Sequence, residues 1–399
     1  MSLLEVPDIL LPISGIDLNK WSVIACDQFT SEIDYWNQVH HLVDNVPSTY
    51  HLILPEAYLD AGFEARIRQV NENMALYLRT GLFQKEKGLV LVKRTTPYQP
   101  QRLGLVVAID LDEYEYLPGK SAKIVASEKT VPERIPPRVL IRENAPIELP
   151  HVLVLADDSE GIIASLGAQR AKYRKLYDFE LNMDGGSIQG FLIEDATSII
   201  ERLEAMAEKS PLIVGDGNHS LAAAKVCWEN IKAQSDANEL SNHPARYAMV
   251  ELMSIYEPGL AFEPIHRVVF DPDDDFLEAL HRASYGSDTL SILMKSSSTY
   301  ALTPDSPFST IEWVQEFLDD YLKAHPKTIL DYVHGTHSLK KIIESEENAI
   351  GIVLPPLQRD QLFPYIKNHG VLPRKSFSLG EAVEKRYYLE TRLIQKERR

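Results

Sequence analysis

Short apolar runs alternate with amphipathic segments along the whole chain. An apolar run of a few residues indicates a strand, whereas apolar residues three and four positions apart indicate a helix. Strands are predicted at residues 21–25, 88–94, 103–109, 151–156, 212–214, 246–255, 262–270, 328–333 and 349–354. Helices are predicted at residues 55–82, 162–179 and 196–209, after the turn at Gly217, and from a capping residue at Ser31. This alternation predicts a mixed α/β (α+β) fold.

The length of 399 residues exceeds what a single hydrophobic core usually covers. Prolines cluster between Pro132 and Pro150, which marks a boundary region. We therefore expect an N-terminal α/β subdomain at 1–150, a central subdomain at 151–270 and a C-terminal α/β subdomain at 271–399.

Composition narrows the classes of partner. The formal net charge of −17 argues against nucleic acid and anionic membranes, which need a basic face, but a few local cations still suffice for a small anionic ligand. No apolar run is long enough to span a membrane. The two cysteines, Cys26 and Cys227, lack metal-ligand spacing, so we expect a cytoplasmic protein without zinc, haem or flavin. Oligomeric state cannot be predicted from the sequence.

The most informative motif is Gly215-Asp216-Gly217-Asn218-His219-Ser220, between an apolar run and an alanine-rich segment. This is the layout of a strand, a tight turn and a helix N-terminus, where backbone N–H groups attract anions. Ser220 or Asn218 can cap the helix, and Gly217 permits positive φ. Asp216 and His219 place an acid and a base beside that helix end. The same residues also suit an ordinary structural turn.

Further clusters combine reactive side chains with turn-forming residues. Asp27 follows Cys26 and either caps a helix or contributes to a site. Near 266 a histidine and an arginine are adjacent in a strand pattern, and the histidine suits a buried hydrogen-bonded imidazole equally well. Basic residues near 134 and 374 are the types that bind phosphoryl oxygens. The candidates from these clusters are Asp27, Glu128, Arg134, His266, Arg267, Arg374, Lys375 and Ser376.

Taken in order, these clusters resemble the bacterial and archaeal family known as domain of unknown function 1015. The family's Asp-Gly-His-His-Arg turn matches residues 216–220, its Pro-Thr-His-Arg strand matches 264–267, and its Pro-x-Lys-Ser-Thr segment matches 373–377. An upstream His-Glu-x-Thr and acid-Arg pair resembles residues 127–130 and 133–134. The chain departs from the family pattern at Ser127, Asn218 and Ser220, which replace two histidines and an arginine.

The family's central turn is similar to that of the ParB and sulfiredoxin superfamily, which includes ADP-dependent free-serine kinases. The resemblance implies a ParB/sulfiredoxin-like core with phosphates on residues 216–219, and Glu128 as the catalytic base. It also implies ADP or ATP with Mg²⁺ as cofactors, and a remote cation, from Arg267, Arg374 or Lys375, in place of the missing motif arginine.

Three functions follow as hypotheses. The first is a nucleotide-dependent phosphotransferase or hydrolase acting on a small polar metabolite, with Asp216, His219 and Glu128 as catalytic residues. The second is a nucleotide- or metabolite-binding regulator without catalysis, which the substitutions at 218 and 220 favour. The third is a metal-dependent hydrolase, for which the residue types suffice although their spacing gives no support.

Overall fold

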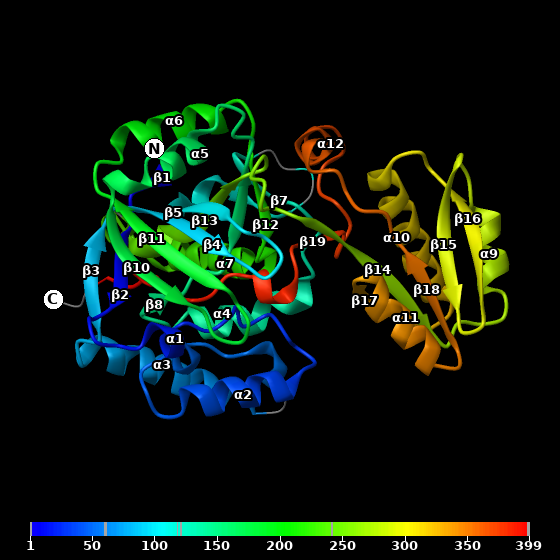
Figure 1. Cartoon of the computed structure of the whole chain (residues 1–399), viewed down its shortest axis with the longest axis horizontal. Coiled ribbons are helices and arrows are strands. Elements are labelled where there is room, and N and C mark those ends of the chain that lie inside the picture. The colour runs from blue at the N-terminus through cyan, green and yellow to red at the C-terminus, as the bar shows by residue number, and fades with distance from the viewer. Residues whose placement is uncertain (1, 60–61, 118, 120–121, 241, 397–399) are drawn as a thin grey trace. The chain divides into compact units, whose positions relative to one another are not determined.

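The structure is a computed structural model that describes residues 2–59, 62–117, 119, 122–240 and 242–396. It divides into two compact units (Figure 1). Unit 1 comprises Met1–Ala126, Thr130–Leu260 and Glu381–Arg399, and unit 2 comprises Ser127–Lys129 and Ala261–Gly380. Each unit has its own sheet and is described by itself.

A mixed ten-stranded sheet forms the centre of unit 1, in the order β10-β11-β4-β5-β13-β9-β12-β7-β6, with β1 on β5. Its strands are β1 (Leu4–Glu5), β4 (Leu89–Thr95), β5 (Arg102–Asp110), β6 (Tyr114–Glu115), β7 (Ile124–Ala126), β9 (Leu153–Ala156), β10 (Arg174–Glu180), β11 (Ser187–Ile193), β12 (Leu212–Asp216) and β13 (Tyr247–Ser254). Two small antiparallel pairs join β2 (Asp8–Pro12) to β3 (Phe83–Lys87) and β8 (Ile147–Glu148) to β20 (Arg392–Leu393). The helices are α1 (Leu18–Trp21), α2 (Ile33–Val43), α3 (Phe63–Arg79), α4 (Ile135–Arg142), α5 (Ile162–Ala168), α6 (Thr197–Ala207), α7 (Asn218–Gln234) and α8 (Ala237–Leu240).

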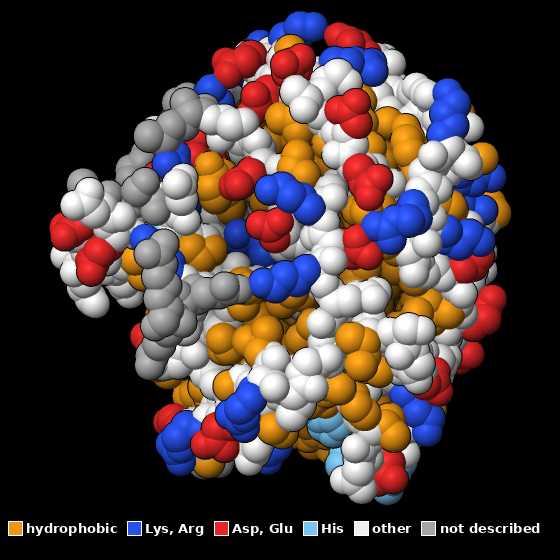
Figure 2. Space-filling view, turned by 90° about the vertical axis from the view of Figure 1, so that its left-hand side faces the viewer, with side chains coloured by type: hydrophobic (Ala, Val, Ile, Leu, Met, Phe, Trp, Pro, Cys, Tyr) orange, Lys and Arg blue, Asp and Glu red, His pale blue; other side chains and the backbone are white. Residues whose placement is uncertain are grey.

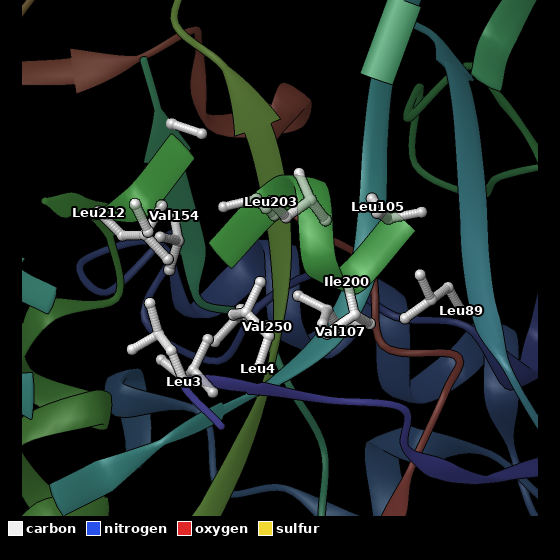
Figure 3. Packing of buried hydrophobic residues seen from close by; sticks show 14 of the residues in the cluster. Leu3, Leu4, Leu89, Leu105, Val107, Val154, Ile200, Leu203, Leu212 and Val250 are labelled. Carbon is white, nitrogen blue, oxygen red and sulfur yellow. The ribbon is translucent and has the colours of Figure 1, made fainter. Parts of the chain in front are cut away.

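Apolar layers cover both faces of this sheet. Successive side chains of a strand point to opposite faces, so Leu105 and Val107 of β5 join one core cluster while Val106 joins the other. Figure 3 shows the first cluster, in which Ile200 and Leu203 of α6 lie over side chains of the sheet. The second cluster includes side chains of α2 and α3. All nine residues of β5 are buried because both faces are covered.

Unit 2 contains a six-stranded antiparallel sheet in the order β16-β15-β18-β14-β17, with β19 on β14. Its strands are β14 (Phe262–Phe270), β15 (Asp288–Met294), β16 (Ser297–Thr303), β17 (Ile329–His334), β18 (Ala349–Val353) and β19 (Phe377–Leu379). Its helices are α9 (Phe276–Ala283), α10 (Pro307–Ala324), α11 (Thr336–Ser345) and α12 (Leu362–His369). Leu339 and Ile343 of α11 pack on Val268 of β14 in the core of this unit.

The predicted mixed α/β fold is confirmed, and the structure confirms most predicted elements. The strands predicted at 88–94 and 103–109 are β4 and β5, which pair antiparallel. Three predictions were wrong. Residues 21–25 form the end of α1 and a single bridge at Ile24 instead of a strand. Helix α2 begins after Glu32 without a side-chain cap, so Ser31 does not cap it. The helix predicted at 162–179 ends at Ala168, and β10 occupies its second half because this segment pairs with β11.

The predicted boundary at residue 150 falls inside unit 1, because β9 and β13 share one sheet with β5. The boundary predicted at 270 lies at the end of β14, which belongs to unit 2. Whether 1–150, 151–270 and 271–399 fold as separate subdomains stays a prediction.

No helix in the described part of the chain combines the length and apolar character needed to cross a membrane. On the face shown in Figure 2, Lys and Arg side chains are interspersed with Asp, Glu and apolar side chains. Both cysteines are free thiols.

Candidate functional site

The central motif forms the predicted strand, turn and helix in unit 1. Strand β12 ends at Asp216, Gly217 has a left-handed backbone (φ 79°), and α7 begins at Asn218. The Gly217 N–H donates to Asp216 Oδ1 (3.0 Å), and the Leu221 N–H makes the first helical bond, to Gly217 O (3.0 Å). A Cβ on Gly217 would meet the Val152 Cα at 3.1 Å, so the turn requires glycine for both its φ and its packing.

The predicted side-chain caps were wrong. Gly217 is the N-cap residue of α7, so neither Asn218 nor Ser220 occupies the capping position. Asn218 is buried at the first position of the helix. The Ser220 hydroxyl is instead 2.9 Å from His151 Nε2. Helix α7 therefore begins after a glycine with positive φ, and not after a side-chain cap as the sequence suggested.

His151 reaches the turn because β9 and β12 pair antiparallel, with Asp216 opposite Leu153. The residues just before β9 therefore lie beside the end of β12 and the first turn of α7. On the other side of its ring, His151 Nδ1 is 2.9 Å from the Tyr388 hydroxyl, which also accepts the Cys26 N–H (3.1 Å). Ser220, His151 and Tyr388 thus form one hydrogen-bonded chain. Burial raises the pKa of the adjacent Cys26 thiol to about 11.

Asp27, a candidate from the sequence, lies beside the hydrogen-bonded residues Ser220, His151 and Tyr388. Its Oδ2 is 3.8 Å from His151 Nε2, and its Oδ1 accepts from the Gln28 amide (2.9 Å). Burial raises the pKa of Asp27, but His151 and the Gln28 hydrogen bond, with help from Arg138 and Lys385, outweigh it. The net effect lowers the pKa, so this carboxylate stays charged at neutral pH.

A cation reaches the turn from the C-terminal segment of unit 1. Lys385 Nζ is 3.1 Å from Asp216 Oδ2, and the lysine side chain is only 6% exposed. Arg94, fully buried, fixes this segment by donating to the carbonyl oxygens of Val383, Glu384 and Lys385. The site therefore holds a buried ammonium beside an acid at a helix N-terminus.

The other motif residues of unit 1 are His219, in the first turn of α7, and Arg134, in the segment before α4. His219 Nε2 accepts the Val131 N–H (3.1 Å), so this nitrogen is unprotonated and the ring is held against the segment that leads into α4. Arg134 is exposed, and its carbonyl oxygen accepts from Arg138 Nη1 (2.5 Å).

The remaining sequence candidates belong to unit 2. The Ser376 N–H donates to Glu128 Oε2 (3.2 Å), and Glu128 forms a parallel bridge with Leu372. The Ser376 hydroxyl donates to Pro373 O (2.7 Å) and is buried. The structure thus brings Glu128 to the predicted basic segment within this unit.

Arg267 contacts the backbone of the basic segment at Arg374 and Lys375, and its guanidinium lies over the Tyr332 ring. It is fully buried, and burial lowers its pKa to about 10. Its donors are directed to Gln315 Oε1 (3.1 Å), Ile265 O (2.7 Å) and Lys375 O (3.0 Å). These contacts position the segment that contains Lys375.

Arg374 makes a two-pronged ion pair with Asp319, at 2.6 and 3.2 Å, and donates to the Tyr332 hydroxyl (2.7 Å). Lys375 adopts a left-handed backbone (φ 56°). Ligand binding by Arg267, Arg374, Lys375 or Ser376 stays a prediction.

His266 is a buried imidazole with a partner on each side of the ring. Its Nδ1 accepts the Leu354 N–H (3.1 Å), so the other ring nitrogen carries the proton and donates to Thr336 Oγ1 (2.9 Å). Burial, with the nearby positive charges of His334 and Arg267, lowers the pKa of His266 to about 4. This environment matches the structural alternative that the sequence left open.

A family model described as a protein of unknown function (DUF1015) matches residues 10–327. The chain belongs to the DUF1015 family. The family resemblance is therefore confirmed, and the matched residues include the β12–α7 turn, whereas residues 373–377 lie outside the match.

Comparison with solved structures finds low similarity to several proteins. A conserved hypothetical protein from Pyrococcus furiosus is 10% identical (TM-score 0.37), with 73% of this chain and 95% of that chain covered. A free serine kinase in complex with AMP is 11% identical (TM-score 0.40; 73% and 91% covered). SbnI with a C-terminal truncation, from Staphylococcus aureus, is 9% identical (TM-score 0.38; 73% and 84% covered). No curated protein matches the chain.

Sequence reasoning missed three residues at the turn of this DUF1015 protein: His151, Lys385 and Tyr388. The available signal was the run Glu384-Lys385-Arg386-Tyr387-Tyr388, whose charged and aromatic residues suit a buried polar network. Its partners could not be read from sequence, because they lie more than 130 residues away along the chain.

Within the described residues, no group of three or more His, Cys, Asp or Glu side chains could hold a metal ion. The described residues therefore form no metal site that consists of three or more of these side chains. The carboxylates of Asp216 and Asp27 are the type of single ligand with which Mg²⁺ binds alongside phosphate oxygens.

Proposed function

We propose that unit 1 binds a phosphate-bearing small molecule at the Asp216–Ser220 turn and transfers its phosphoryl group to a small polar metabolite. The observation that carries the proposal is the buried Lys385 ammonium, 3.1 Å from Asp216 at the N-terminus of α7. A cation, a helix N-terminus and a turn with a glycine of positive φ together suit phosphoryl oxygens.

The charge balance supports this ligand class. Phosphoryl transfer depends on neutralising charge and aligning the reacting groups. Lys385 and the positive end of α7 supply the neutralisation. Asp216, held by Lys385, is the residue that would hold Mg²⁺ with the phosphate oxygens. When bound, Mg²⁺ would neutralise part of the phosphate charge.

ADP or ATP is the proposed phosphoryl donor, as the family resemblance implied from sequence. His219 of unit 1 and Glu128 of unit 2 remain predicted catalytic residues. Binding without transfer is a second candidate function. Ser220 stands at the position of the motif arginine, and its hydroxyl is hydrogen-bonded to His151, so position 220 provides no cation to bind a phosphate.

The experiment is calorimetric titration of the full chain with pyrophosphate, ADP and ATP, each with and without Mg²⁺ at constant ionic strength. Lys385→Met should weaken pyrophosphate binding about tenfold, since it removes one charge-assisted contact. The matched control is Lys123→Met, which removes an exposed lysine paired with Glu208 in the same unit. Equal affinity in Lys385→Met and wild type would refute the site.

Turnover separates the two candidate functions. Phosphorus NMR of the protein with ATP, Mg²⁺ and a panel of small hydroxyl metabolites should show a new phosphate ester if unit 1 is a transferase. Nucleotide binding with no product across the panel would favour the binding regulator.

A further inference from the structure

A cavity of about 130 Å³ opens beside the Ser220–His151–Tyr388 chain in unit 1. Most of its wall is apolar and comes from α3, α4, α7 and the segment before α3, with Leu54, Met74, Ile141 and Ala223 among the lining residues. Ser220, His151 and Tyr388 line it as well, so one wall carries hydroxyl and imidazole groups.

The charged residues in the wall are already paired. Arg138 contacts Glu56, and Arg142 is 2.6 Å from Glu148. An ion entering the cavity would therefore lose its hydration without gaining an opposite charge. The occupant that suits this wall is neutral.

The polar wall selects for a hydroxyl group. His151 is 9% exposed and is bonded on both ring nitrogens, and the Ser220 hydroxyl completes the chain at the helix end. A hydroxyl oxygen both donates and accepts one or more hydrogen bonds, so an incoming alcohol can extend such a chain without leaving a buried donor or acceptor unmatched.

The volume limits the size of the apolar body. An apolar protein cavity of about 150 Å³ holds one benzene molecule. A cavity of about 130 Å³ therefore takes a body of roughly six carbon atoms. Burial of such a body in an apolar wall is favourable in proportion to the area removed from water.

We infer that this cavity binds a small neutral hydroxyl compound, with its apolar body against Met74 and Ala223 and its hydroxyl on the Ser220 hydroxyl. The binding itself is independent of the proposed function. The role of the occupant rests on it: if unit 1 transfers a phosphoryl group, the acceptor is the hydroxyl compound in this cavity, which narrows the small polar metabolite of the proposed function to an alcohol with an apolar body.

Phenol and benzene are suitable probes, because they share one ring and differ by the hydroxyl. Titration of the full chain, followed by ligand-observed NMR, should show that wild type binds both and prefers phenol about fivefold, the size of one net hydrogen bond. Ser220→Ala should keep benzene binding and lose the preference for phenol. Ala223→Leu should abolish binding of both probes by filling the cavity.

Ala233→Leu is the matched control, since it adds the same side chain at an exposed position of the same helix, and it should bind both probes as wild type does. Ser220→Ala adds no volume and tests the inference even if leucine at 223 prevents folding. Failure of wild type to bind either probe, wild-type binding by a folded Ala223→Leu, or an unchanged phenol preference in Ser220→Ala would each overturn the inference. Pyrophosphate titration of the same samples tests the proposed function separately, because the probes carry no phosphate.

Discussion

Replacing Gly217 by alanine tests how the turn is built. Gly217 and Gly161 are both N-cap glycines in unit 1 with left-handed backbones, at φ 79° and 66°. A Cβ on Gly161 meets nothing within 4 Å, whereas a Cβ on Gly217 meets the Val152 Cα at 3.1 Å. Gly161→Ala therefore isolates the conformational cost, and Gly217→Ala adds the steric cost.

The two costs can be estimated separately. An alanine in the left-handed conformation destabilises the folded state by about 1–2 kcal/mol. Alanine also restricts the unfolded chain, and this effect offsets about 0.4–1 kcal/mol of that cost. Gly161→Ala should thus lower the free energy of unfolding by about 1 kcal/mol. Crowding against the buried Val152, just before β9, adds about 1–3 kcal/mol. Gly217→Ala should therefore lower it by about 2–4 kcal/mol.

Urea unfolding followed by tryptophan fluorescence measures the difference. Trp21, Trp36 and Trp228 lie in unit 1, and Trp313 is the tryptophan of unit 2. A Trp313→Phe background therefore makes the fluorescence report on unit 1 alone. Equal losses in the Gly161 and Gly217 variants would refute the steric argument. The same samples should show pyrophosphate binding lost only in Gly217→Ala, and retention there would show that the turn does not contact the anion.

Three further predictions concern charges and thiols. Asp216→Asn should abolish the Mg²⁺ dependence of ATP affinity while leaving Lys385 to bind pyrophosphate. Calorimetry measures both affinities, and a Mg²⁺ effect equal to that of wild type would show that Asp216 does not bind the metal. Because the pKa of His266 is lowered to about 4, the unfolded state binds the extra proton, so unit 2 should lose stability as the pH falls from 6.5 towards 4. His266→Asn, which keeps a hydrogen-bond acceptor, should show a shallower dependence of its urea midpoint on pH, and an equal slope would contradict the assignment. In a Cys227→Ser background, iodoacetamide at pH 8 should modify Cys26 far more slowly in the folded than in the urea-unfolded protein, because its pKa is raised to about 11; equal rates would show that the thiol is not held in its protonated form.

Local patterns predicted the elements whose neighbours are close in the chain. The β4–β5 hairpin and the β12–α7 joint follow from apolar runs, turn residues and an alanine-rich segment, which act within about twenty residues. The segment 162–179 failed because its second half pairs with β11, and tertiary pairing overrode the helical pattern. Exposed Arg174 and Lys175 on this edge strand carry no apolar alternation that would have indicated a strand.

The site was predictable at the turn and unpredictable around it. Asp216, Gly217 and His219 could be named because the turn chemistry is contiguous in sequence. His151 reaches Ser220 only through the antiparallel register of β9 on β12, and no feature of a single sequence measures that register. The same holds for Lys385, whose place depends on a segment held by the buried Arg94.

The departure of Ser220 from the family motif acquires a physical meaning from these contacts. The Ser220 hydroxyl lies against His151, which is bonded on both ring nitrogens and has the carboxylate of Asp27 beside it. Serine closes a hydrogen-bonded chain with His151 and Tyr388, while Lys385 supplies positive charge to the turn from another segment. We propose that the substitution separates two tasks: Lys385 supplies positive charge beside Asp216, and Ser220 supplies a hydroxyl group. Ser220→Arg should accordingly strengthen pyrophosphate binding while eliminating phenol binding, and a variant that bound both ligands as wild type does would show that the two tasks are not separated at this residue.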